Sequence, residues 1–284
     1  MKFGPTDAVF EGFRITRQKP VLLLWLGLVY AVISAITVAL AYQSFVELMG
    51  FVATIQAGQE PDEALAMQLL GAYGRVIAVA LPLSLVASAI IWPAIVRSVL
   101  TPEDSRFGYL RLGRDELNTF VVVLALSLVW VAALVLAGAI VGLAALAGVA
   151  FAVLTGLLVF FGLVAFALWF GVKFSLAVPI TVAEKRIAIM DSFRMTKGHF
   201  WPLLGMALLA GILSFGVNLL VNIIAMPFAA ISGGGFGLLT GQGVTALTII
   251  GFIGTVVLSL LMASAQALIL YAPFVSAYRM LKQS

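Results

Sequence analysis

Long stretches without any charged residue constrain this chain more than any other feature. No Asp, Glu, Lys or Arg occurs between Leu117 and Val172, nor between Val21 and Val46. Hydrophobic residues make up 63% of the 284 positions and charged residues only 10%, against about 25% charged residues in an ordinary soluble domain. Too few charges remain to cover a water-facing surface, so lipid must surround most side chains. The sequence therefore predicts an all-α polytopic integral membrane helix bundle, with residues 1–284 forming one membrane domain.

The apolar stretches predict six transmembrane helices, because each span needs about 20 apolar residues. The third and fourth stretches are long enough for two spans each, and glycines mark a turn within both of them. The predicted spans occupy Val21–Val46, Val76–Val96, Leu117–Val172 with a turn near Gly138, Gly142 and Gly148, and Gly198–Tyr278 with a turn at Ser232–Gly243.

The Lys and Arg residues predict how these spans are oriented. The chain has 16 of them, and all except Arg75 fall on one side of the six-span arrangement. Cytoplasmic loops carry the excess of Lys and Arg in membrane proteins. We therefore expect the N-terminus and the C-terminus to lie in the cytoplasm.

A short motif recurs along the chain and predicts repeated helical hairpins. The segment Phe13–Arg17 reads FRITR, and the segment Phe193–Lys197, 180 residues later, reads FRMTK. A weaker copy, Arg111–Arg114, precedes the third span, and a proline closes each pair of spans, at Pro93, Pro179 and Pro273. The simplest interpretation is three hairpins of one design, over residues 8–100, 108–180 and 188–281.

Each copy of the motif carries two basic residues three positions apart, which share one face of a helix. We expect these segments to be amphipathic and to lie along the inner leaflet. Their cations either serve only as topology signals or form a contact site for anionic lipid head groups or a protein partner. The candidate contact residues are Arg14, Arg17, Arg111, Arg114, Arg194 and Lys197.

A few polar residues inside or beside the spans are further candidates. Asn218 and Asn222 lie four residues apart in the fifth span, and Gln266 lies in the sixth. These amides either line a substrate path or form hydrogen bonds between helices. Glu47 and Arg75 lie at the outer ends of the first two spans, where they predict an interfacial ion pair or, alternatively, an ion or proton relay.

The remaining residues include no recognisable set of catalytic side chains. The chain has no Cys and a single histidine, His199, and the sequence contains no nucleotide-binding motif or metal-ligand spacing. We therefore predict no enzymatic activity, no metal and no cofactor. Charges beside apolar spans argue against a nucleic-acid partner. The mixed charges between Glu103 and Glu116 predict a solvated, salt-bridged loop or a docking surface.

Two segments resemble a known family. The string SFRMTKGHFWPLL at Ser192–Leu204, after a Pro-x-x-x-x-Glu segment at Pro179–Glu184, is similar to the membrane-domain family related to glycerophosphoryl diester phosphodiesterases. The loop LTPEDSRFGYLRLGRDEL at Leu100–Leu117 is similar to a loop of uncharacterised bacterial relatives. The resemblance implies a multi-span domain in a bacterial inner membrane. It carries over no catalytic residue, because the phosphodiesterases hydrolyse their substrate in a separate soluble barrel.

Two functions fit these features. One is a non-enzymatic scaffold or accessory subunit whose basic cytoplasmic face contacts anionic lipids, a protein partner or another copy of the chain. The alternative is a transporter or lipid-handling permease with a cavity between the hairpin repeats. The discriminating feature is whether Asn218 and Asn222 line a cavity in the membrane or pack against another span.

Overall fold

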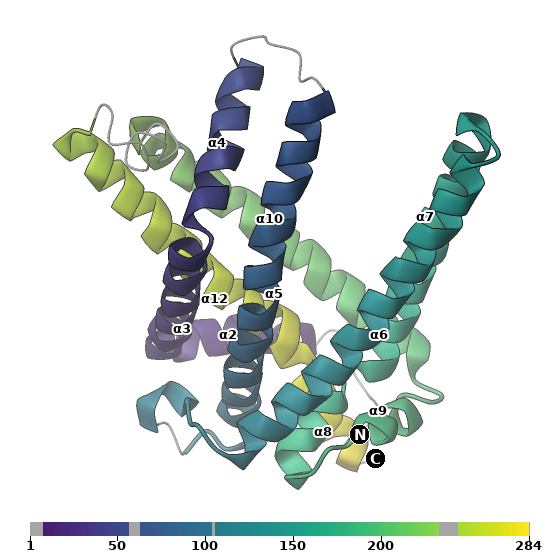
Figure 1. Ribbon diagram of the computed structural model, residues 1–284. Helices are drawn as coiled ribbons and strands as arrows, with labels where there is room; N and C mark the ends of the chain where they lie inside the picture. The colour runs from purple at the N-terminus through teal and green to yellow at the C-terminus, as the bar shows by residue number, and fades with distance from the viewer. Residues whose placement is uncertain (1–7, 57–62, 104–105, 233–243, 284) are drawn as a thin grey trace.

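A computed structural model describes residues 8–56, 63–103, 106–232 and 244–283, and the described part contains helices and no strand (Figure 1). The elements are α2 (Glu11–Gln18), α3 (Pro20–Leu40), α4 (Tyr42–Gln56), α5 (Glu63–Leu100), η1 (Arg106–Tyr109), α6 (Arg114–Ala145), α7 (Val149–Phe174), α8 (Ala177–Glu184), α9 (Ile189–Met195), α10 (Phe200–Ser232) and α12 (Ala246–Gln283). Three short helical segments, η1, α8 and α9, lie between consecutive long helices near one end.

Six of these helices are long and apolar enough to cross a membrane, which confirms the predicted all-α polytopic membrane bundle. The candidate spans begin at Pro20, Glu63, Phe107, Val149, Phe200 and Ala246. Their outward surfaces are rich in exposed Leu, Val, Ile and Phe, as lipid-facing helices require.

Two arginines on α5 mark the thickness of the apolar layer. Arg75 and Arg97 lie 22 residues apart on this helix, which corresponds to about 33 Å along the helix axis at 1.5 Å per residue. This length matches the roughly 30 Å of hydrocarbon in a bilayer. The helix of 38 residues therefore extends beyond the apolar layer, mainly on the Arg75 side.

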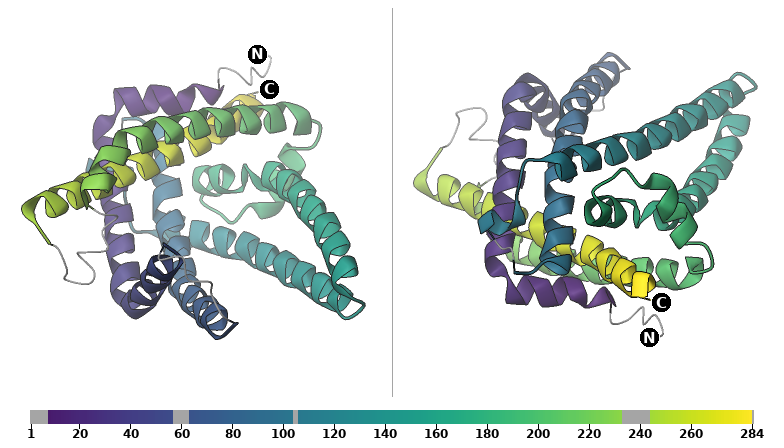
Figure 2. Two further views of the ribbon diagram at one scale, coloured as in Figure 1. Left: turned by 90° about the horizontal axis from the view of Figure 1, so that it is seen from above. Right: turned by 90° about the horizontal axis from the view of Figure 1, so that it is seen from below.

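The long helices converge at one end of the molecule and separate toward the other (Figure 1). We call the convergent end, which carries Lys19, Arg97, Arg114, Lys173 and Lys282, the basic end. The residues just before α2 and the end of α12 pack together there. Along the chain, α4 packs against α5, α6 against α7, and α10 against α12. Figure 2 shows the α6–α7 pair leaning away from the other helices.

Two clusters of buried side chains form the core near the basic end. One joins α3, α5, α6, α8 and α12, and the other joins α7, α8, α10, α12 and the residues before α2. Helix α8 lies at the centre, where residues Ala177 to Val182 are all buried. Since lipid tails are as apolar as leucine, close packing rather than escape from water holds such helices together.

Several predicted boundaries are wrong in detail. The first apolar stretch is interrupted, because α3 ends at Leu40 and a new helix starts after Ala41. The turn predicted within Leu117–Val172 lies at residues 146–148 alone, where Gly148 has φ +123°. Gly138 and Gly142 lie inside α6, since an isolated glycine weakens a helix without ending it. The glycine run 233–243 lies outside the described residues.

The prolines within the spans do not end their helices. Helix α5 continues through Pro82 and Pro93, and α10 continues through Pro227. Neighbouring helices and local backbone adjustment allow proline inside membrane helices.

The FRITR copy lies within α2, which precedes the long helix α3. The FRMTK copy begins in α9, which precedes α10 and ends at Met195, so Lys197 lies outside the helix and the predicted shared helix face is wrong for Arg194 and Lys197. In α2, Gly12 lies so close to α12 that an added Cβ would be 2.6 Å from the Cα of Ile269. One face of α2 therefore packs on protein, while Arg14 and Arg17 are exposed on the other. The Arg111–Arg114 copy departs from the expectation, because α6 begins only at Arg114 and Arg111 precedes it outside any helix.

Candidate functional site

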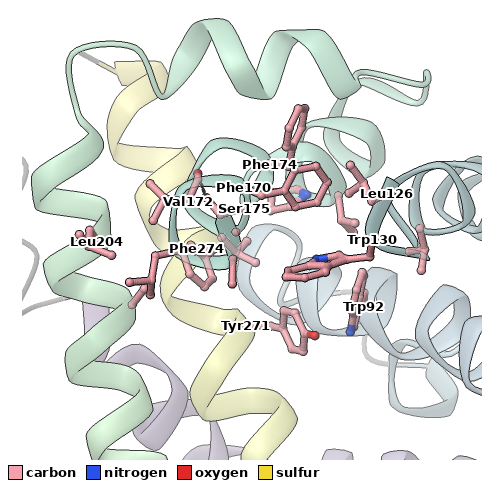
Figure 3. Close-up of a pocket in the computed structure, with 18 of the residues that line it drawn as sticks. Trp92, Leu126, Trp130, Phe170, Val172, Phe174, Ser175, Leu204, Tyr271 and Phe274 are labelled. Atoms are coloured by element: carbon pink, nitrogen blue, oxygen red, sulfur yellow. Dashed lines mark hydrogen bonds between the residues drawn. The ribbon is translucent and has the colours of Figure 1, made fainter. Parts of the chain in front are cut away.

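A cavity of about 480 Å³ lies among the hairpins on the side of the basic end (Figure 3). Helices α5, α6, α7, α8, α10 and α12 all contribute to its wall, so every hairpin takes part. Its volume lies in the range of roughly 300–1,000 Å³ that is typical of small-molecule sites. Six aromatic side chains dominate the lining, namely Trp92, Trp130, Phe170, Phe174, Tyr271 and Phe274.

The aromatic rings pack edge to face and obliquely, as their quadrupoles favour. Trp130 of α6 meets Phe170 of α7 with ring centroids 6.1 Å apart and planes at 77°. Trp92 of α5 meets Tyr271 of α12 at 4.7 Å. Figure 3 shows Trp92, Trp130 and Tyr271 close together on one side of the cavity. Rings from three hairpins therefore meet at one site.

The polar groups in the lining are few and uncharged. They are the hydroxyls of Ser127, Ser175 and Tyr271 and the indole N–H groups of Trp92 and Trp130. Ser175 donates its hydroxyl to the carbonyl of Val172 at 2.8 Å, which satisfies it within its own helix turn. No carboxylate, Lys, Arg or His is among the lining residues in the described part of the chain. The site can therefore hold an apolar molecule and offers it only neutral hydrogen bonds.

Helix α8 forms part of the cavity wall. Val178 and Pro179 line the cavity, and Figure 2 shows α8 within the frame of long helices when the molecule is seen from below. Ser192 of α9 helps to fix its start, because its hydroxyl donates to the carbonyl of Lys173 at 2.9 Å and accepts the N–H of Leu176 at 3.2 Å. Thr181 accepts the N–H of Ala188 at 3.3 Å.

The three amides predicted inside the membrane do not line this cavity. Asn222 donates its side-chain N–H₂ to the carbonyl and the side-chain oxygen of Asn218, both at 2.8 Å. The pair satisfies itself along one face of α10, and Asn222 is exposed. Gln266 is half-buried on α12 and is also absent from the lining. The hypothesis that these amides line the cavity is wrong for this site, and the asparagines form no hydrogen bond to another helix among the described residues.

Glu47 and Arg75 form the ion pair expected at the end opposite to the basic end. Arg75 also donates from Nε to the hydroxyl of Ser44 at 3.0 Å. The pair connects α4 to α5, and its arginine side chain is 57% exposed. The described residues add no further carboxylate to it, so the contacts are those of a structural pair.

The six cations of the predicted contact surface, Arg14, Arg17, Arg111, Arg114, Arg194 and Lys197, are all exposed near the basic end. Arg14 pairs with Glu11 at 2.6 Å in the same helix. Nearby, hydrogen bonds from Arg186 to Asp191 and Glu184 raise the pKa of that guanidinium above its usual value, so it remains charged.

A buried ionic network at the basic end was not predicted from the sequence. Arg97 donates from Nη2 to Glu116 at 2.6 Å and to Asp115 at 3.1 Å, and from Nη1 to the carbonyl of Tyr109 at 3.0 Å. Arg97 and Glu116 are 9% and 6% exposed, so the prediction of a solvated loop is wrong for Glu116. Glu116 also caps α6 by accepting the N–H of Gly113 at 2.9 Å. The Gly-x-x-Glu spacing before an apolar run was the available signal.

The same network includes Lys19 and a tight turn. Lys19 donates from Nζ to the Tyr109 hydroxyl at 2.6 Å and to the Ser98 carbonyl at 2.9 Å. Phe107, Gly108 and Tyr109 all have positive φ. Trp25 covers this turn, since a Cβ added to Gly108 would lie 2.4 Å from its Cδ1. These contacts fix hairpin 1 to the start of hairpin 2 and so hold one wall of the cavity in place.

No protein-family model, curated protein or solved structure matches this chain. The resemblance of Ser192–Leu204 to the phosphodiesterase-related membrane family therefore stays a prediction.

Proposed function

We propose that this chain is a lipid-handling protein of the bacterial cytoplasmic membrane, which holds an apolar lipid chain in the cavity between its three hairpins. The observation that carries the proposal is the lining itself, because aromatic rings from α5, α6, α7 and α12 meet around open space and carry no charge. Such a lining suits a hydrocarbon chain, because small-molecule sites are lined mainly by apolar and aromatic side chains.

The same features make a lipid a better occupant than an ion or a polar solute. A polar substrate would need convergent hydrogen-bonding or charged groups in the membrane, whereas Asn218 and Asn222 bond to each other outside the cavity. We propose no catalytic role, because the lining offers no carboxylate, His or Cys, and the Ser175 hydroxyl is held by a backbone carbonyl.

The proposed orientation places both termini and the basic end in the cytoplasm. Its support is the concentration of Lys and Arg at this end and the presence of Arg75 at the other.

The proposal is tested by filling the cavity. Gly171 lines it, and a Cβ added there meets no atom within 4 Å, so Gly171→Leu puts an apolar side chain into the space. Gly162→Leu on the same helix is the matched control, because it also meets nothing and lies outside the lining. We expect the purified wild-type protein and the Gly162→Leu variant to retain the same lipid in native mass spectrometry, and Gly171→Leu to lose it.

Equal lipid retention by the wild type and both variants would overturn the proposal. Loss of lipid from both variants would overturn it as well, because the loss would then not depend on the cavity.

A second role, as an accessory subunit that contacts anionic lipids, is favoured by the exposed cations of α2 and of the α9 region. Changing Arg14, Arg17, Arg194 and Lys197 to Gln should reduce the anionic lipid that co-purifies in native lipid particles. Unchanged lipid content would reject this role and would leave the cavity proposal intact.

A further inference from the structure

The cavity lacks any group that could neutralise a charged ligand. An ion moved into an apolar interior without a partner costs several kcal/mol or more. No Lys or Arg is among the lining residues in the part of the chain that the structure describes. A phosphate inside the cavity would therefore have no cationic partner there.

Neutral donors nevertheless converge at one point of the lining. Trp92 and Tyr271 come from different hairpins, and their rings lie 4.7 Å apart at an angle of 44°. Tyr271 lies between the buried residues Ile269 and Ala272, yet its side chain keeps 36% of its surface open. Figure 3 shows the Tyr271 hydroxyl directed toward the side of the cavity where Trp92 lies.

Tyr and Trp side chains in apolar surroundings usually place their O–H and N–H groups against a hydrogen-bonding partner. The Trp92 N–H already has such a partner, because it hydrogen-bonds to the Tyr271 hydroxyl. The Tyr271 O–H is the donor left for a ligand, and a ligand hydroxyl or carbonyl oxygen would accept it without bringing a charge. The other aromatic rings of the lining, such as Phe170 and Phe274, would surround its hydrocarbon part.

We infer that the ligand of this cavity is an uncharged lipid, whose hydroxyl or carbonyl group lies at Trp92 and Tyr271, and that phospholipids with an ionised head group are excluded from it. This inference rests on the proposed lipid-handling function and names the class of lipid. Diacylglycerols, which carry one free hydroxyl beside their ester carbonyls, belong to this class.

The test compares two probes that share their acyl chains and differ in head group. The full-length protein is placed in nanodiscs of phosphatidylcholine that contain equal mole fractions of a diacylglycerol and the matching phosphatidylglycerol. Lipid retained after release is then counted by native mass spectrometry. We expect the diacylglycerol to exceed phosphatidylglycerol roughly tenfold in the wild type, and this excess to disappear in Gly171→Leu.

Tyr271→Phe tests the position of the polar group, because it removes the hydroxyl and keeps the ring. One neutral hydrogen bond contributes about 0.5–1.5 kcal/mol, so diacylglycerol retention should fall roughly two- to thirteenfold. The matched control is Tyr73→Phe, on the exposed part of α5, where retention should not change. Should Gly171→Leu fail to fold, Ala207→Leu fills the same cavity from α10.

The outcomes separate this inference from the function on which it rests. Phosphatidylglycerol that is retained at least as well as diacylglycerol, and lost in the filled variants, would overturn the inference while leaving a lipid-handling cavity. If the cavity-filling variants retain as much lipid as the wild type, both the inference and the proposed lipid-handling function would be overturned. Diacylglycerol retention unchanged by Tyr271→Phe would overturn the placement of its polar group.

Discussion

Removing Arg97 should destabilise the protein more than any other change of a charged residue, because it leaves two carboxylates facing each other in a buried site. Arg97 contacts Glu116 at 2.6 Å and Asp115 at 3.1 Å, and the side chains of Arg97 and Glu116 are only 10% and 7% exposed. Breaking a buried pair by removing one partner typically costs about 3–5 kcal/mol. We expect a loss of this size in the free energy of unfolding of Arg97→Met.

Glu116→Leu should cost less, about 1–3 kcal/mol, because Arg97 keeps Asp115 and the carbonyl of Tyr109 as acceptors. In the double variant Arg97→Met/Glu116→Leu both buried charges are replaced by apolar side chains. Such replacement is often nearly neutral, so the double variant should be more stable than the sum of the single losses predicts.

The measurement is reversible unfolding in mixed micelles with increasing SDS, followed by helical circular dichroism. Arg186 provides a matched control, since it also contacts two carboxylates, Glu184 at 2.6 Å and Asp191 at 2.7 Å. Its side chain is 57% exposed, so Arg186→Met should have no resolvable effect. A loss below about 1 kcal/mol for Arg97→Met, or strictly additive losses in the double variant, would refute the reasoning.

Three further outcomes follow from close contacts and exposure. Gly108→Ala should lower the free energy of unfolding by at least about 1–2 kcal/mol, because φ is +62° and the new Cβ would lie 2.4 Å from Trp25. Unfolding in SDS measures this loss. Gly12→Ala should detach α2 from α12, since its Cβ would lie 2.6 Å from the Cα of Ile269, and faster hydrogen exchange confined to α2 would reveal this. The chain has no Cys, so Leu146→Cys, at a position 84% exposed, should react with an impermeant maleimide added outside the cell.

The two glycine variants share one control, and the cysteine variant has one outcome that would contradict it. Gly216→Ala lies inside α10, and its Cβ meets nothing within 4 Å, so this variant should be neutral or slightly stabilised, in contrast to the other two glycines. Labelling of Leu146→Cys only after the membrane is opened would show that the proposed orientation is inverted.

The sequence by itself determined that lipid surrounds most of the chain, how many spans it has, and at which ends of the spans Lys and Arg gather. Hydrocarbon excludes charge over about 30 Å, so the lengths of the uninterrupted apolar stretches, with the glycines that divide two of them, are enough to count the spans. The pairing of Glu47 with Arg75 was also within reach, because both residues lie at the same boundary of consecutive spans.

Only the tertiary structure decided which side chains meet. Asn218 and Asn222 were candidates for a substrate path or for hydrogen bonds between helices, yet a hydrogen bond within α10 satisfies them. Trp92, Trp130 and Tyr271 looked like ordinary apolar residues, because periodicity cannot tell a lipid-facing ring from one that lines a cavity when every face of a helix is apolar. Whether a residue lies in the cavity depends on how α5, α6 and α12 cross, and those crossings are set by packing between segments far apart in the chain.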